Sequence, residues 1–290
     1  MTRVQLTHPE RVLWPDCGVT KGDLAAYYLE VAPFMLPHVA GRPLSLVRSP
    51  EGIDGARFFQ KHPMRGSPAA IRAVPIRESK GVKDYMAIDD ADGLVSLAQI
   101  GATEIHAWGS RVADLEHPDL LTFDLDPDPS VPWARTVAAA REIRARLGAL
   151  GLESFAKTTG GKGVHVVVPL SPRPDWDEVR AFSHALVETL AGEKPGEYLA
   201  TASKAARRGK IFLDYLRNGR GATAVCPFST RARPGAPVAT PVSWRELTAR
   251  LDPARFEVKS VAARLARLTR DPWEGFAKLR QTLPAARERG

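Results

Sequence analysis

Leu-Leu-Thr-Phe-Asp-Leu-Asp-Pro, residues 120–127, is an apolar run that ends in two acidic residues and a proline. Successive side chains of a β-strand point to opposite faces, so Asp124 and Asp126 would share one face and Phe123 and Leu125 the other. Two carboxylates that close repel each other unless a cation compensates them, and Mg²⁺ or Mn²⁺ favours such oxygen ligands. The stretch therefore predicts a buried strand with a metal-binding end. An acidic turn after a buried strand is the alternative.

The composition is that of a globular protein with a basic surface. The chain has 290 residues, of which 44% are hydrophobic and 26% charged, enough for one large or two ordinary domains. A net charge of +8 and a pI near 9.7 favour a polyanionic partner such as nucleic acid. The two cysteines, Cys17 and Cys226, lack zinc-type spacing and fit a reducing compartment. Since no apolar signal core opens the chain and no run approaches about 18 apolar residues, we expect a cytoplasmic protein that does not engage a membrane.

Helical and extended patterns alternate along the chain, which indicates an α/β (α+β) protein. Strands are expected at residues 44–47, 85–88, 94–100, 155–159, 164–169 and 211–216, with residues 89–93 as a hairpin turn. Helices are expected at 24–29, 132–150, 175–190, from Ser243 to Leu247, at 260–268 and at 273–283. No linker or shift in composition divides the chain, so we expect a single domain over residues 1–290, with the helices from about residue 243 packed on the core.

A third acidic residue lies within a strongly basic region. Asp214 is the one acid between Ser203 and Arg233. The basic residues of this region number eight: Lys204, Arg207, Arg208, Lys210, Arg217, Arg220, Arg231 and Arg233. A carboxylate buried in an apolar strand is unfavourable unless it is paired or bound to metal, so Asp214 is the expected third metal ligand. A salt bridge to a neighbouring arginine is the alternative.

A glycine-rich turn offers a site for phosphate. Gly-Gly-Lys-Gly, residues 160–163, follows Thr159 and leads into His165. The amides of such a turn can approach a phosphate closely while Lys162 supplies charge. It is not a Walker A loop, because no Gly-Lys-Ser/Thr opens a helix here. A hairpin turn without ligand is the alternative.

Two further groups are candidates for contacts with DNA. Thr20 can cap a helix that begins at Lys21, where free amides and the helix dipole favour an anion, and Arg11 lies nearby in sequence. The alternative is that Lys21 and Arg11 are ordinary surface charges. Phe58 and Phe59 are flanked by basic residues, and an exposed ring there could stack on an unpaired base. The alternative is that both rings are buried under a loop.

In this order and spacing, the motifs resemble the polymerase domain of bacterial ligase D, of the archaeo-eukaryotic primase superfamily. The resemblance runs from residue 6 to about residue 247. Its strongest blocks are Ala-Thr-Glu-Ile-His (102–106), Phe-Asp-Leu-Asp-Pro (123–127), Lys-Thr-Thr-Gly-Gly-Lys-Gly-Val-His (157–165) and Asp-Tyr-Leu-Arg-Asn (214–218). It implies a primase-polymerase fold with a central, mostly antiparallel sheet flanked by helices. It also implies a DNA repair polymerase (a nucleotidyltransferase) that fills or extends broken ends in non-homologous end joining, with two Mn²⁺ (or Mg²⁺) ions and a preference for ribonucleotides.

Residue by residue, the resemblance implies the following roles. The metal-binding catalytic carboxylates are Asp124, Asp126 and Asp214. The nucleoside triphosphate is surrounded by His106, Thr159, Lys162, His165 and Arg231, although His106 taken alone would be an ordinary histidine. Arg11 and Lys21 hold a 5′-phosphate of the downstream strand, and Phe58 and Phe59 stack on the template. Thr159 stands where the family usually has Ser, which keeps the hydroxyl, and His8 stands where Asn is common.

The expected partners follow from the same resemblance. They are DNA with gaps or double-strand breaks and nucleoside triphosphates. The nuclease and ligase domains of ligase D are not expected in this chain, so Ku and a separate ATP-dependent DNA ligase are further expected partners. A metal-dependent glycosyltransferase, which also uses Asp-x-Asp, is a rival function, but it would not need the basic region. An inactive DNA-end-binding module is a second rival, which the presence of three acids disfavours.

Overall fold

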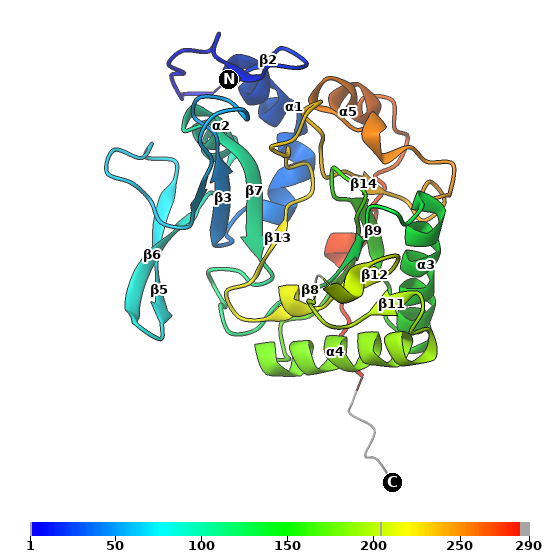
Figure 1. Ribbon diagram of the computed structural model, residues 1–290. Helices are drawn as coiled ribbons and strands as arrows, with labels where there is room; N and C mark the ends of the chain where they lie inside the picture. Colours follow the sequence, from blue (N-terminus) through cyan, green and yellow to red (C-terminus); the bar gives the residue numbers. More distant parts are fainter. Residues whose placement is uncertain (1, 204, 285–290) are drawn as a thin grey trace. The chain divides into compact units, whose positions relative to one another are not determined.

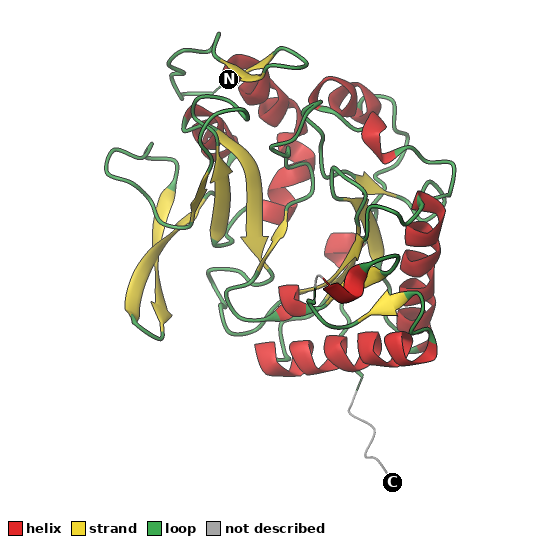
Figure 2. Cartoon of the chain, in the orientation of Figure 1, coloured by secondary structure: helices red, strands yellow, loops and turns green. Residues whose placement is uncertain are grey.

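The computed structural model describes residues 2–203 and 205–284 and separates into two compact units, each with helices and strands (Figures 1 and 2). The first unit comprises Met1–Ala113, Thr223–Thr240 and Pro253–Asp271, and the second comprises Asp114–Ala222, Pro241–Asp252 and Pro272–Gly290. Lys204 of the basic region lies outside the described residues. None of the helices in the described part of the chain is long and apolar enough to cross a membrane. The expectation of one domain over residues 1–290 stays a prediction.

The first unit contains a six-stranded sheet in which all pairs are antiparallel. Its order is β13-β7-β3-β6-β5, with β4 also paired to β3. The bounds are β3 (Leu44–Arg48), β4 (Phe58–Gln60), β5 (Arg72–Glu78), β6 (Gly81–Ala87), β7 (Ala102–Trp108) and β13 (Thr223–Val225). A small separate sheet pairs β1 (Val12–Trp14) with β2 (Val19–Thr20). Helix α1 (Lys21–Val39) packs against both α2 (Ala91–Gln99) and α5 (Val258–Leu265).

Helix α2 replaces a predicted strand. The prediction of a strand at residues 94–100 after a hairpin turn at 89–93 is wrong, because Asp90 caps a helix by accepting a hydrogen bond from the amide of Gly93 at 2.9 Å. Leu94, Val95 and Leu97 are all fully buried, and an apolar run of this length does not distinguish a buried helix from a strand.

The second unit also contains a six-stranded sheet, in the order β11-β12-β8-β10-β9-β14. The bounds are β8 (Leu120–Pro127), β9 (Phe155–Thr158), β10 (Val164–Pro169), β11 (Tyr198–Leu199), β12 (Ile211–Asp214) and β14 (Pro241–Val242). The β11-β12 pair is parallel and the others are antiparallel. Helix α3 (Trp133–Ala149) packs on β8 and β10, and α4 (Trp176–Glu193) packs on β8 and β11. The predicted α+β class with mainly antiparallel sheets is confirmed, with two large sheets in place of one.

Strand β8 is confirmed from Leu120 to Pro127. Phe123 and Leu125 are fully buried, as the alternating pattern predicted. On the opposite face, the side chain of Asp124 is 17% exposed and that of Asp126 is 55% exposed. The acidic face therefore opens toward solvent at the proline end of the strand.

The last part of the chain is less helical than predicted. Residues 258–265 form a helix near the expected 260–268. The predicted helix that Ser243 would cap is wrong: Ser243 does accept a hydrogen bond from the amide of Glu246, but the residues that follow form only turns. The predicted helix at residues 273–283 is also wrong, since only Phe276–Lys278 forms a 3₁₀ turn. Gly275 interrupts any longer helix with a φ of 88°, a left-handed conformation.

Candidate active site

Strand pairing in the second unit brings the three predicted carboxylates together. Asp214, the last residue of β12, lies directly opposite Asp124 of β8, and Asp126 is two residues further along β8. His165 of β10 lies opposite Asp124 on the other side, and Lys157 of β9 lies opposite His165. Directly opposed residues on one face have Cβ atoms about 4.5–5.5 Å apart. Asp214, Asp124, His165 and Lys157 thus form a continuous row of ionisable side chains across four strands.

Two arginines hold these carboxylates. The Arg217 Nε atom donates to Asp124 Oδ2 at 3.2 Å and lies 3.2 Å from Asp214 Oδ2. Arg207 donates to Asp126 Oδ2 at 2.5 Å, and its guanidinium lies over the ring of Phe212. The salt bridge considered as an alternative for Asp214 is therefore present. As they stand, no three His, Cys, Asp or Glu side chains among the described residues are grouped to hold a metal ion.

The pKa values of Asp124 and Asp214 are shifted in opposite directions. Burial alone would raise the pKa of Asp124, but His165, Arg217 and Lys157 outweigh it and keep this pKa below its usual range. Burial, with the nearby charge of Asp124, raises the pKa of Asp214 above its usual value, although Arg217 opposes the shift. A carboxylate beside an ionised carboxylate is repelled by its charge, so a cation bound between Asp124 and Asp214 would be stabilised.

His165 is a buried neighbour of Asp124. Its side chain is 3% exposed, and burial together with the charge of Lys157 lowers the pKa of His165 to about 4. The imidazole is then neutral at pH 7, and its Nε2 atom lies 3.2 Å from Asp124 Oδ1. None of the described residues forms a hydrogen bond with the buried Nδ1 atom. The contact of His165 with Asp124 is thus in the structure, while its role toward a triphosphate stays a prediction.

Asn218 is a site residue that the sequence analysis did not single out. Its side chain, which is 1% exposed, accepts from the Thr122 amide at 2.8 Å and donates to the Thr122 carbonyl at 2.9 Å. Strand β12 has ended at Asp214, so the amide group of Asn218 takes the place of a strand partner for β8. This tethers the loop that carries Arg217. The one signal in the sequence was its place in the block 214–218.

The glycine-rich turn lies against the end of β8. A Cβ atom on Gly163 would lie 2.9 Å from both the Leu125 carbonyl oxygen and Thr159 Oγ1, so only glycine allows this approach. Thr159 is 8% exposed, and its amide donates to the Gly163 carbonyl at 3.2 Å. Lys162 is exposed, and its Nζ donates to the Pro129 carbonyl at 2.8 Å. The turn therefore presents Lys162 to solvent from a fixed loop.

In the first unit, a buried acid joins two of the predicted triphosphate ligands. Glu104 Oε2 accepts from His106 Nε2 at 2.8 Å and lies 3.1 Å from Arg231 Nε. Its other oxygen, Oε1, accepts from the Ala232 amide at 3.0 Å. Burial would raise the pKa of Glu104, but the hydrogen bond from His106 and the charge of Arg231 lower it to about 2. Glu104 was quoted only as part of the block 102–106, and nothing in the sequence marked it as buried.

The helix cap predicted at Thr20 is confirmed, but the amides it exposes are not free. The amides of Lys21, Gly22 and Asp23 already donate to oxygens of the chain at 2.8 to 3.1 Å. The Lys21 side chain is buried, and burial together with the charge of Arg11 lowers its pKa. Arg11 forms an ion pair with Glu51 at 2.8 Å. A 5′-phosphate site at these two cations stays a prediction, and it cannot use these three amides as they stand.

Phe58 and Phe59 are both exposed, by 52% and 62%. They lie on the short strand β4, which pairs with β3. The alternative of two rings buried under a loop is therefore wrong. The structure leaves two aromatic rings available for stacking, and their contact with a template stays a prediction.

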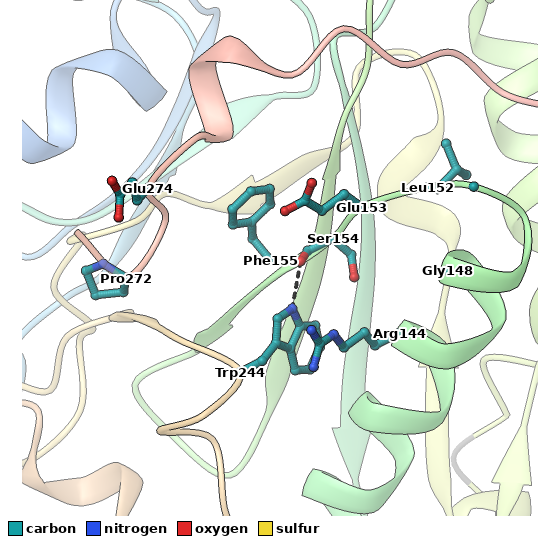
Figure 3. A pocket seen from close by; sticks show the side chains of 10 residues that line it. Arg144, Gly148, Leu152, Glu153, Ser154, Phe155, Trp244, Pro272 and Glu274 are labelled. Carbon is teal, nitrogen blue, oxygen red and sulfur yellow. Dashed lines mark hydrogen bonds between the residues drawn. The ribbon is translucent and has the colours of Figure 1, made fainter. Parts of the chain in front are cut away.

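A pocket of about 530 Å³ lies in the second unit (Figure 3). Its lining includes Arg144, whose guanidinium lies 4.9 Å from the ring centroid of Trp244, and the Trp244 indole donates to the Ser154 carbonyl at 2.6 Å. No residue of the predicted site lines this pocket. The candidate site is instead the row on the sheet.

Comparison with known proteins identifies the family. The sequence profile described as "LigD, primase-polymerase domain" matches residues 20–273. The chain belongs to this family. The LigD primase-polymerase domain is a nucleotidyltransferase, as the resemblance implied.

Similar proteins agree with this assignment. The chain is 40% identical over 287 residues to the "Multifunctional non-homologous end joining protein LigD" of Pseudomonas aeruginosa, covering 99% of this chain and 34% of that protein. It is 34% identical over 247 residues to the protein of the same description from Mycolicibacterium smegmatis, covering 84% of this chain and 32% of that protein. The chain thus spans about a third of the length of these LigD relatives.

A solved structure extends the agreement to the fold. The polymerase domain of Mycobacterium tuberculosis ligase D, in complex with DNA, matches with a TM-score of 0.89 and 33% identity. The match covers 96% of this chain and 99% of that one. The predicted primase-polymerase fold is confirmed.

Proposed function

We propose that this chain is a DNA repair polymerase that adds nucleotides to a 3′-OH at gaps or broken ends during non-homologous end joining, by two-metal catalysis and with a preference for ribonucleotides. The observation that carries the proposal is the register that puts Asp214 opposite Asp124, with Asp126 on the same strand. The descriptions of the LigD relatives support the repair pathway. In that pathway Ku and an ATP-dependent DNA ligase would be partners.

The donor set fits a hard divalent ion. All three predicted ligands are carboxylates, and the raised pKa of Asp214 beside ionised Asp124 means that added positive charge is favourable there. Asp124, Asp126 and Asp214 would hold the ions, Mn²⁺ or Mg²⁺. Arg217 and Arg207 occupy the same oxygens and would have to yield them. Bound ions would lower the pKa of the attacking hydroxyl and neutralise charge on the phosphates.

The reaction sets the tasks of the other side chains. The primer 3′-OH gives up its proton to solvent and its oxygen bonds to the α-phosphorus, while the bond from that phosphorus to the bridging oxygen breaks and pyrophosphate leaves with the electron pair of that bond. Catalysis of such a transfer is mainly positioning and stabilisation of charge. Lys162 is an exposed cation on a fixed turn, which suits the β- and γ-phosphates. Thr159, His106 and Arg231 would complete the triphosphate contacts.

The test is primer extension on gapped DNA with Mn²⁺ or Mg²⁺, comparing wild type with Asp214→Asn and the matched control Asp128→Asn. Asp128 lies just beyond β8 and accepts hydrogen bonds from Ser130 within its own turn. We expect extension by wild type and the control and none by Asp214→Asn. Absence of extension by wild type with either metal would refute the function, and normal extension by Asp214→Asn would remove Asp214 from the metal site.

The preference for ribonucleotides needs its own measurement. Matched ribo- and deoxynucleotides compete for one gapped substrate, and the products are separated by alkaline cleavage. Equal incorporation of the two would remove the preference from the proposal without affecting the polymerase activity.

A further inference from the structure

Glu104 is a buried acid at the meeting point of two chain segments of the first unit. It is 7% exposed, and its carboxylate contacts the His106 imidazole, the Arg231 guanidinium and the Ala232 amide. A carboxylate in such a position is unfavourable unless it is hydrogen-bonded and paired with a cation. Hydrogen bonds from His106 and the Ala232 amide, with the Arg231 guanidinium beside it, meet that requirement, so the position is built around a negative charge.

The fold fixes both partners of this carboxylate. Glu104 and His106 are two residues apart on β7 and therefore lie on the same face. The segment before Arg231 is held to β7, because Thr230 Oγ1 donates to the Thr103 carbonyl at 2.7 Å. The Arg231 carbonyl accepts from the Trp14 indole at 3.1 Å. With the backbone held on both sides, the remaining freedom of Arg231 is in its long side chain, which Glu104 restrains.

We propose that Glu104 is a positioning residue that holds His106 and Arg231 in one arrangement, so that the two bind the triphosphate as a unit. This rests on the proposed function, in which both side chains contact the nucleotide. Glu104 itself does not touch substrate. Because the ionised carboxylate can only accept, it requires a proton on His106 Nε2, which sets the tautomer of the ring. Glu104 also restricts the Arg231 side chain before the nucleotide binds, so that less conformational entropy is lost on binding.

The test is Glu104→Gln, which keeps the shape of the side chain and removes its charge. We expect the KM for nucleotide in gapped-DNA extension to rise roughly ten- to hundredfold, the range for loss of a charged hydrogen bond. Affinity for gapped DNA, measured by fluorescence anisotropy, should stay within about twofold. Glu116→Gln is the matched control: it makes the same change at an exposed pair with Arg220, outside the site, and should leave KM unchanged.

A double-mutant cycle separates positioning from general stability. If Glu104 acts through Arg231, the pair Glu104→Gln with Arg231→Ala should raise KM little more than Arg231→Ala alone. A merely structural role predicts additive effects and a parallel loss of kcat, DNA affinity and melting temperature. Imidazole ¹H–¹⁵N spectra, assigned with His106→Asn, should also show the Nε2–H tautomer of His106 in wild type and a mixture of both tautomers in Glu104→Gln, because an amide can either accept from Nε2–H or donate to Nε2.

If Glu104→Gln does not fold, Glu104→Asp tests the same point, because it keeps the charge but is one methylene too short for all three contacts. It too should raise KM for nucleotide. An unchanged KM in a folded, active variant, or additive effects in the cycle, overturns the proposal. Lack of extension by wild type refutes the proposed function instead.

Discussion

Replacing Arg217 with Gln should tighten the binding of divalent metal. Arg217 contacts one oxygen each of Asp124 and Asp214 at 3.2 Å, and these are oxygens that the proposed ions need. The arginine and the metal therefore compete. A charged hydrogen bond contributes about 1.5–3 kcal/mol, but the Arg217 side chain is 41% exposed and its charge is screened. A net of about 1–2 kcal/mol for the two contacts corresponds to roughly five- to thirtyfold tighter binding in the variant.

The assay is titration of the nucleotide-free protein with Mn²⁺, followed by electron paramagnetic resonance of the free ion. Arg220→Gln is the matched control, since Arg220 forms an ion pair with exposed Glu116. We expect tighter Mn²⁺ binding by Arg217→Gln alone. An unchanged or weaker affinity would show that Arg217 does not compete with metal and would refute the reasoning.

Four further predictions follow. Asp214→Asn should abolish nucleotide addition without lowering the melting temperature of the metal-free protein, because it relieves repulsion and the burial of a charge; a clearly lower value in calorimetry would contradict this. Glu104, with a pKa of about 2 in the fold against 4.5 unperturbed, should stabilise the protein fully above pH 4.5 and lose that contribution as the pH falls toward 2. Urea unfolding between about pH 5 and pH 3 should therefore show a smaller loss of stability for Glu104→Gln than for wild type. Asn218→Ala should lower the unfolding free energy in urea by about 2–4 kcal/mol, because it leaves two buried backbone groups of β8 unpaired, and a loss below about 0.5 kcal/mol would deny that role. Lys21→Ala should reduce the preference for gapped DNA with a 5′-phosphate over gapped DNA with a 5′-hydroxyl by up to about tenfold in anisotropy titrations. Equal binding of the two DNAs by wild type would show that Lys21 has no such role.

The elements that the sequence predicted correctly have local causes. Strand β8 and the shared face of Asp124 and Asp126 follow from a period of two, which eight residues suffice to display. The cap at Thr20 likewise depends on residues within one turn of helix. Helix α2 was missed because it spans only nine residues, and a short apolar run such as residues 94–97 does not by itself distinguish a buried helix from a strand.

The rest of the site depends on contacts between distant residues. Asp214 meets Asp124 across 90 positions of sequence, and the local pattern of β12 carries no information about which strand it will pair with. The basic residues after Ser203 predicted an affinity for polyanions but not which arginines would turn toward the acids. Glu104 reads as an ordinary charged residue until the fold buries it between His106 and Arg231.

The basic region therefore has two roles, to pair with the carboxylates of the site and to bind polyanions, whereas the sequence indicated only the second. Arg207 and Arg217 are engaged with carboxylates of the same unit, so the net charge of +8 overstates the number of cations ready to meet DNA or nucleotide. They also stabilise, in the metal-free protein, three acids whose charges would otherwise repel. An ion that takes over the carboxylate oxygens releases both guanidinium groups beside the bound metal, where phosphate oxygens are the natural acceptors. By linkage, a triphosphate that engages the released arginines must tighten metal binding by the same factor as metal tightens nucleotide binding. This coupling should shrink in Arg217→Gln, which keeps only Arg207 of the two arginines that metal releases.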